Sequence, residues 1–206
     1  MKSRASASTP KLSTSVLLLA AFCGSCSSNV TLSAGRDDAP SLKVDQPFPS
    51  AGSIEMQLEV GSYNIRPAAN DRIRVTFSGN IGNATAALAT NGSHAMLAVK
   101  DTPHNNFKAT VEVPGTADLV VRHAGGDLDM AAIAGNKDID SKAGDLTITA
   151  GSPNDYSTLD ATVKIGDLDG GPFGSADGDL SHHLAWSGHG KYTFRANLGA
   201  GDLKLK

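Results

Sequence analysis

Gly144-Asp145-Leu146-Thr147-Ile148 is the stretch that best indicates how this chain folds. Gly, Leu and Ile share one side of an extended backbone here, while Asp and Thr share the other. This alternation is typical of a β-strand with one buried face. Glycine at the strand entry permits a positive φ at a tight corner, and the aspartate can accept hydrogen bonds from nearby amides. The stretch therefore predicts a corner followed by a half-buried strand.

The same phrase recurs through the C-terminal half of the chain. Its copies are Gly126-Asp127-Leu128, Lys137-Asp138-Ile139, Gly144-Asp145-Leu146, Gly166-Asp167-Leu168, Gly178-Asp179-Leu180 and Gly201-Asp202-Leu203. We expect each copy to start a strand whose aliphatic residue enters a common interior. The pattern predicts an all-β domain, a repetitive β-roll or short β-solenoid-like stack of short strands. The uneven spacing of the copies favours a short, twisted roll or a pair of packed sheets over a long regular solenoid.

Alternating segments also occur outside these copies. Strands are predicted at 53–60, 61–65, 72–77, 95–99, 107–113, 119–121, 191–196 and 203–206. Residues 79–92 show no clear period. The last two segments carry outward lysine and arginine residues, which we expect to protect an exposed sheet edge.

Length and composition agree with one domain built from strands. The chain has 206 residues, 22 of them glycine, and only 5% are aromatic. This length is enough for a real hydrophobic core, and the glycine content favours many short strands over long helices.

The N-terminus resembles a bacterial lipoprotein signal. A basic start without acids precedes the short apolar run 16–22, which is too short to span a bilayer. Cys26 follows the small residues Gly24 and Ser25, so the resemblance implies that Cys26 is lipidated and becomes the first residue of the mature protein. Ordinary secretion, or a redox pair of Cys23 with Cys26, are the alternatives.

The segments after the signal are predicted to be a flexible tether at 27–50 and a folded domain at 51–206. The tether is rich in Ser, Asn, Asp and Pro. Removal of residues 1–26 takes away three cations and no acid, so the formal charge would fall from -3 to -6. This charge disfavours nucleic acid as a partner.

The folded part resembles the bacterial putative-adhesin domain, an envelope family of unknown function. The resemblance rests on segments 110–114, 119–121 and 125–130 and on the later Gly-Asp-Leu copies. Lys137 departs from the pattern because glycine would be usual there. The resemblance implies an exported domain in the bacterial cell envelope, periplasmic or on the outer face, held to the membrane by the lipid anchor. It implies no catalytic residue.

Aligned carboxylates raise one chemical hypothesis. If corner aspartates stacked in register they would repel, and a calcium ion near Asp167, Asp169, Asp177 and Asp179 could offset the repulsion. The alternative is that uneven intervals keep the carboxylates out of register. The spacing matches neither the EF-hand loop nor the calcium-binding nonapeptide repeat, so the sequence predicts neither a metal site nor a cofactor.

The histidines offer a second, weaker metal hypothesis. His182 or His183 with His189 would supply two ligands, but no residue completes the pattern. Exposed loop histidines are the alternative, and Trp186, which alternates with Leu184, is expected in the core or at its rim.

Two functional classes follow from these observations. The first is a noncatalytic, envelope-anchored module that adheres to or binds another envelope or surface component, either a protein or a glycan. The second is a carbohydrate-active enzyme that uses outward carboxylate pairs such as Asp127 with Asp129 or Asp138 with Asp140. The sequence contains no nucleophile elbow, phosphate loop or zinc motif, which favours the noncatalytic class. A structural or signalling component is a third possibility.

Overall fold

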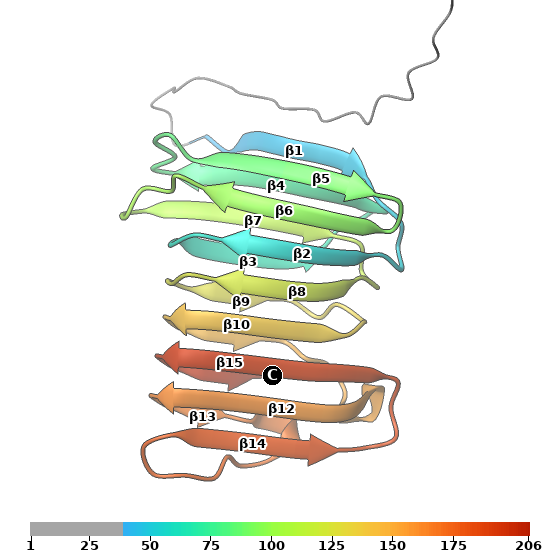
Figure 1. Cartoon of the computed structure of the whole chain (residues 1–206), viewed down its shortest axis with the longest axis vertical. Coiled ribbons are helices and arrows are strands. Elements are labelled where there is room, and N and C mark those ends of the chain that lie inside the picture. Colours follow the sequence, from blue (N-terminus) through green and yellow to red (C-terminus); the bar gives the residue numbers. More distant parts are fainter. Residues whose placement is uncertain (1–38) are drawn as a thin grey trace, which may run out of the picture.

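The computed structural model describes residues 39–206, which form two β-sheets around one hydrophobic core (Figure 1). Each sheet has eight strands and mixed parallel and antiparallel pairing, and the sheets do not close into a barrel. Within these residues there is no α-helix, and the helical elements are the short 3-10 turns η1 (Pro153–Asp155) and η2 (Gly171–Phe173). The predicted all-β class is confirmed.

Sheet A has the strand order β1-β4-β7-β3-β9-β11-β16-β13. The bounds of its strands are β1 (Ser41–Pro47), β3 (Ser62–Pro67), β4 (Arg72–Gly79), β7 (Phe107–Val113), β9 (Leu128–Met130), β11 (Leu146–Ile148), β13 (Leu168–Asp169) and β16 (Leu203–Leu205).

Sheet B has the order β14-β12-β15-β10-β8-β2-β6-β5. The bounds of its strands are β2 (Ser53–Leu58), β5 (Thr85–Asn91), β6 (His94–Lys100), β8 (Asp118–His123), β10 (Lys137–Ala143), β12 (Tyr156–Ile165), β14 (His182–Ser187) and β15 (Tyr192–Ala200). Strand β5 lies in the stretch where the sequence shows no period.

Parallel pairing occupies the centre of both sheets. Strands β7, β3, β9, β11, β16 and β13 run parallel in sheet A, and β6, β2, β8, β10, β15 and β12 run parallel in sheet B. Antiparallel partners are added at the ends: β4 and β1 in sheet A, β5 and β14 in sheet B. Parallel strands cannot be joined by a tight hairpin. Here the chain passes from a strand of sheet B through a corner to a strand of sheet A before it returns.

Glycines make these corners possible. The corner glycines stack in the spatial order Gly61, Gly126, Gly144, Gly201 and Gly166. A Cβ atom on any of the last four would overlap the carbonyl oxygen of the preceding one. Those four also have φ between +100° and +127°, where side chains are strained. The predicted role of glycine at the corners is therefore confirmed for these copies of the phrase.

Backbone hydrogen bonds join each corner to the next. The amides of Leu128, Leu146 and Leu203 donate to the carbonyl oxygens of Asp145, Asp202 and Asp167 at 2.9, 2.8 and 2.9 Å. The three leucine side chains are each only 1% exposed, as the alternation predicted. Corner and core are thus built by the same few residues.

The spatial order of the corners differs from their order in the sequence. Strands β15 and β16, the last in the chain, lie between β10 and β12 and between β11 and β13. The prediction that these final segments form an exposed, lysine-protected edge is wrong, because each is hydrogen-bonded on both sides. Their insertion also explains the uneven sequence intervals, since corners far apart in the chain become neighbours.

Two copies of the phrase do not form corners. Lys137 begins β10 with its side chain buried, so that copy lies inside a strand. Leu180 is 87% exposed in the loop before β14, because Gly178-Asp179-Leu180 lies outside the stack of parallel strands. The prediction of an inward leucine is wrong for this copy.

The N-terminal end of the described region is also strand. β1 falls within the predicted tether 27–50, so the tether assignment is wrong for Ser41–Pro47, which pairs with β4 and packs Val44 against the core. The other predicted domain boundaries stay predictions. Within residues 39–206 no helix is long and apolar enough to cross a membrane.

Candidate binding groove on sheet B

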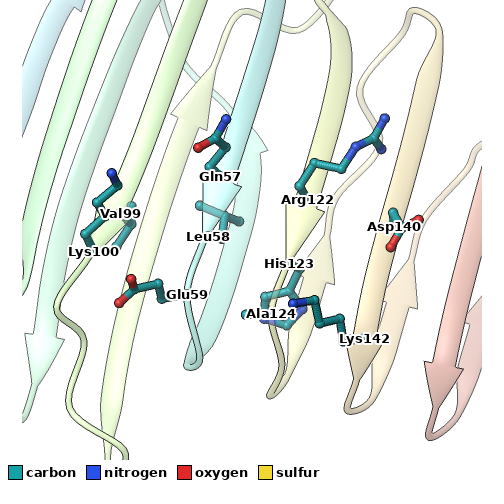
Figure 2. A pocket seen from close by; sticks show the side chains of 10 residues that line it. All are labelled: Gln57, Leu58, Glu59, Val99, Lys100, Arg122, His123, Ala124, Asp140 and Lys142. Carbon is teal, nitrogen blue, oxygen red and sulfur yellow. The ribbon is translucent and has the colours of Figure 1, made fainter.

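A groove of about 440 Å³ opens on sheet B where β6, β2, β8 and β10 end (Figure 2). Its lining residues come from these strands and the turns that follow them: Gln57, Leu58, Glu59, Val99, Lys100, Arg122, His123, Ala124, Asp140 and Lys142. Pockets of this size are common binding sites for small ligands. The groove is therefore the candidate functional site.

Strand register explains why these side chains meet. Val99, Leu58, His123 and Ser141 are aligned across the four parallel strands. The residues that follow them, Lys100, Glu59, Ala124 and Lys142, therefore form a second row at the strand ends. Ala124 has the smallest side chain in this row, so the hollow opens between its longer neighbours.

Only some of the groove charges are paired. The Arg122 guanidinium bonds the Asp138 carboxylate at 2.7 Å, and this bond raises the pKa of Arg122 and lowers that of Asp138. Glu59 accepts a hydrogen bond from the amide of Thr102 at 3.3 Å. Among the described residues, Lys100, Lys142 and Asp140 take part in no ion pair.

His123 lies beneath the groove and is 2% exposed. Its Nδ1 atom is 3.0 Å from Ser141 Oγ, and its ring packs edge-on against Tyr63 with centroids 5.4 Å apart. Its Nε2 atom and the Tyr63 hydroxyl are buried without a hydrogen-bond partner among the described residues. Burial lowers the pKa of His123 and raises the pKa of Tyr63, which favours the neutral forms of both groups.

A second hollow of about 360 Å³ lies where β2 and β6 begin, whereas the groove lies where these two strands end. Met96, Val120 and Ala89 line it together with polar residues of β2, β5 and β6, and Met96 is 48% exposed. Both hollows therefore open over the β5 to β10 half of sheet B.

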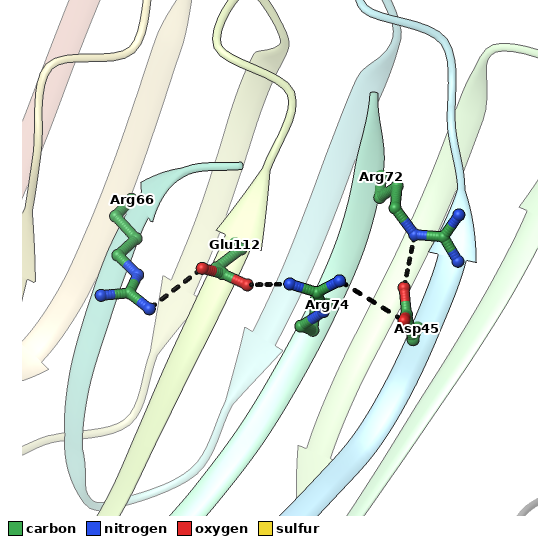
Figure 3. A network of polar contacts seen from close by, with 5 residues as sticks. All are labelled: Asp45, Arg66, Arg72, Arg74 and Glu112. Carbon is green, nitrogen blue, oxygen red and sulfur yellow. Dashed lines mark hydrogen bonds and ion pairs between the residues drawn. The ribbon is translucent and has the colours of Figure 1, made fainter. Parts of the chain in front are cut away.

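The outer face of sheet A is chemically different. A chain of ion pairs crosses four of its strands and links Arg66, Glu112, Arg74, Asp45 and Arg72 (Figure 3). The hydrogen bond from Arg72 and the nearby charge of Arg74 lower the pKa of Asp45. These charges satisfy one another, so this face offers a ligand fewer free groups than the groove does.

The corner aspartates lie in register along one edge of the molecule. Asp145 Oδ1 accepts from the amide of Asp202 at 3.3 Å, and Asp202 Oδ1 accepts from the amide of Asp167 at 3.0 Å. The interpretation that uneven intervals keep these carboxylates apart is wrong, because the insertion of β16 restores the register. Hydrogen bonds from neighbouring amides help to offset the repulsion.

The aspartates of the calcium hypothesis contact different partners. Asp169 accepts from the amide of Gly171 at 3.0 Å and pairs with Lys204 at 3.3 Å, and both contacts lower its pKa. Asp177 forms a backbone bridge with His183, and Asp167 lies 3.9 Å from His182. Asp179 belongs to the loop copy of the phrase. Across residues 39–206 no three His, Cys, Asp or Glu side chains are grouped to hold a metal ion.

The predicted histidine pair is not assembled. His182 and His183 begin β14, opposite Val163 and Thr162 of β12, whereas His189 follows the other end of β14. Trp186 is partly buried against the core and packs edge-on to Phe173 at 5.5 Å, as its rim assignment predicted.

The carboxylates of the enzyme hypothesis occupy different surroundings. Asp138 is held by Arg122, and its lowered pKa makes it a poor proton donor near neutral pH. Asp140 lines the groove, while Asp127 lies at a corner and accepts from Ser62 Oγ at 3.3 Å. Cys26, the predicted lipidation site, lies outside the described residues.

Comparison with solved structures identifies the fold. A structure described as a putative cell adhesion protein from Clostridium sporogenes superposes with a TM-score of 0.51 and 13% identity, over 82% of this chain and 99% of that chain. Structures described as putative adhesins from Bacteroides fragilis and Parabacteroides distasonis give TM-scores of only 0.27 and 0.26 at 10% and 12% identity. They cover 82% of this chain and 98% and 71% of their own.

The predicted resemblance to the putative-adhesin domain is confirmed as a likeness of fold by the Clostridium structure. No protein-family model and no curated protein match the sequence.

Proposed function

We propose that this chain is a noncatalytic module of the bacterial cell envelope that binds another envelope or surface component through the groove on sheet B. The observation that carries the proposal is the 440 Å³ groove, with Lys100, Lys142 and Asp140 around it and no ion pair among them. These groups keep their hydrogen-bonding capacity for a partner. The fold is shared with a structure described as a putative cell adhesion protein, which agrees with a binding role.

The scaffold supports this role as a β-roll or short solenoid-like stack. Its corners repeat through Gly61, Gly126, Gly144, Gly201 and Gly166, which fixes the register of the parallel strands. A rigid sheet holds outward side chains at defined spacings, so a binding surface forms without large rearrangement.

The lipid anchor is the second part of the proposal. Cys26 after Gly24 and Ser25 would tie the domain to the membrane, and the residues between Cys26 and β1 would set its distance from the lipid surface. Labelling with radioactive palmitate in the wild type and in Cys26→Ser tests this part. Loss of label in the variant supports lipidation at Cys26, whereas retained label redirects attention to Cys23.

Binding through the groove is tested with the full chain and isolated envelope fractions. We expect the double variant Lys100→Gln/Lys142→Gln to lose retention on wall or membrane fractions. Lys164→Gln, which removes an exposed lysine of β12 outside the groove lining, is the matched control and should be retained like the wild type. Equal retention of all three proteins would refute the groove as the binding site.

A further inference from the structure

Building on the proposed function, we propose that the groove recognises a zwitterionic ligand, a short peptide with a free amino group and a free carboxyl group. The ligand would place its carboxylate near Lys100 on β6 and its ammonium near Asp140 on β10, both of which line the groove. This chemistry distinguishes the ligand from a polyanion and from a neutral glycan.

The first support is that opposite charges at the groove stay apart. Asp140 and Lys142 are two residues apart on β10 and share its outer side. Lys100 and Glu59 follow the aligned pair Val99 and Leu58 on neighbouring strands. Opposite charges on neighbouring strands commonly pair. Among the described residues neither couple forms an ion pair, so both signs of charge remain available.

Arg122 shows that pairing is possible on the same face. Its guanidinium meets Asp138 on the neighbouring strand at 2.7 Å, directly beside the groove. The same sheet therefore pairs one cation directly. Asp140, which is aligned with Arg122 and whose charge contributes to the raised pKa of Arg122, forms no ion pair among the described residues, and neither do the flanking lysines.

The second support is the balance of these free charges. Two lysines face the groove together with two carboxylates, Glu59 and Asp140, because Arg122 is already compensated by Asp138. A polyanion would meet as many carboxylates as free cations, so repulsion would cancel much of its attraction. The lining contains no Phe, Tyr or Trp on which a sugar ring could stack. A zwitterion satisfies both kinds of charge.

The dimensions fit a short peptide. Lys100 on β6 and Asp140 on β10, which would hold the two termini of the ligand, lie three strand spacings apart, which corresponds to about 14 Å. An extended tripeptide spans about 10 Å, and the side chains of Lys100 and Asp140 can cover the remaining distance.

The test titrates the full chain with tri-alanine in four forms, which differ only in their terminal charges: free, N-acetylated, C-amidated, and blocked at both ends. Binding is measured as amide chemical shifts of Gln57, Arg122 and Ala124. We expect free tri-alanine to bind best and each blocked terminus to weaken binding by about tenfold. An N-acetylated form that binds as tightly as the free peptide would show an anion site and overturn the proposal, as would a fully blocked form that binds equally well.

Variants assign the two charges to residues. Asp140→Asn should weaken the binding of free tri-alanine. C-amidation should still weaken binding to this variant, because the contact of the peptide carboxylate remains. N-acetylation should have no further effect, because the contact of the peptide ammonium is already lost. Lys100→Gln should show the reverse pattern, and Lys164→Gln should change neither effect. Absence of any tri-alanine binding would overturn the ligand class. If envelope retention still depended on Lys100 and Lys142, the proposed binding role would stand without it.

Discussion

The Lys137 ammonium lies 2.9 Å from the hydroxyl oxygen of Tyr156 in the core of the molecule. The lysine is 2% exposed and also donates to the carbonyl oxygen of Gly135 at 3.2 Å, while the Tyr156 hydroxyl donates to the carbonyl oxygen of Ala150 at 2.8 Å. No carboxylate among the described residues forms an ion pair with it. Burial therefore lowers the pKa of Lys137 to about 8, and nearby Asp118 and Asp155 offset this shift only partly.

This burial gives the stability of the protein a distinctive pH dependence. The folded pKa of Lys137 is below the ordinary value of 10.5, so between pH 8 and pH 10.5 the unfolded chain binds more protons than the folded one. The free energy of unfolding should therefore rise with pH in this window. Urea titrations at pH 7, 8, 9 and 9.5, below the ionisation of tyrosine, measure the trend.

Lys137→Met should remove this dependence. Methionine keeps the length of the side chain without a charge, and the Tyr156 hydroxyl keeps its bond to Ala150. We expect the variant to be more stable than the wild type at pH 7 by roughly 1–3 kcal/mol and to show a flat profile from pH 8 to 9.5. A variant with the wild-type slope would mean that another group titrates in this range.

The glycine corners give a second prediction, and the chain supplies its own control. Gly144 and Gly174 have nearly equal φ values of 115° and 111°, but a Cβ on Gly144 would overlap Gly126 whereas a Cβ on Gly174 would meet nothing within 4 Å. Gly174→Ala should cost only the backbone strain, about 1–2 kcal/mol. Gly144→Ala must also displace a neighbouring corner, and we expect a loss of at least about 3 kcal/mol or failure to fold. Equal losses in urea unfolding would contradict the stacking argument.

The sequence could predict the corners because their physics is local. Alternation placed Leu128, Leu146 and Leu203 inside, and the requirement for a small residue with positive φ placed glycine before them. Strand β7 was predicted with its observed bounds for the same reason, since Phe107–Val113 alternates and Pro114 follows it.

The order of the strands could not be predicted from the same pattern. Nothing local distinguishes Asp202, which belongs between Asp145 and Asp167, from a corner at the end of the stack. The choice is made by pairing across the sheets, where β15 aligns Phe194 with Lys137 on one side and Leu159 on the other. For this reason two predictions were wrong: that the last two segments form an exposed edge, and that the corner carboxylates lie out of register.

The groove was also beyond sequence reasoning, although its residues carry a signal. Lys100, Glu59, Ala124 and Lys142 each follow a buried strand residue, so each belongs to the outward row of its own strand. Their proximity depends on the non-sequential order β6-β2-β8-β10, which local periodicity does not contain. His123 was missed because the inward positions before it on β8, Leu119 and Val121, are aliphatic, and the alternation gave no sign of a buried histidine after them.

Two copies of the repeated phrase provide a third prediction. Leu146 and Leu180 both follow Gly-Asp, yet they are 1% and 87% exposed. Leu146→Ala should lower the free energy of unfolding by about 2–5 kcal/mol because it leaves a cavity between the sheets. Leu180→Ala should change it by less than about 0.5 kcal/mol. Chemical denaturation of both variants tests whether spatial stacking, and not the phrase itself, determines the role of each leucine.

The ion-pair chain on sheet A gives the last prediction. Glu112 bridges Arg66 at 3.0 Å and Arg74 at 3.1 Å, and its side chain is 16% exposed, the least of the five. Glu112→Gln keeps the shape but removes the charge that both arginines share, so we expect a loss of about 1–2 kcal/mol at low salt. The loss should shrink in 1 M sodium chloride because salt screens partly exposed pairs. Asp129→Asn, an exposed acid on the same sheet, serves as the control and should be neutral at both salt concentrations. An equal loss for Glu112→Gln at low and high salt would attribute its effect to packing and not to charge.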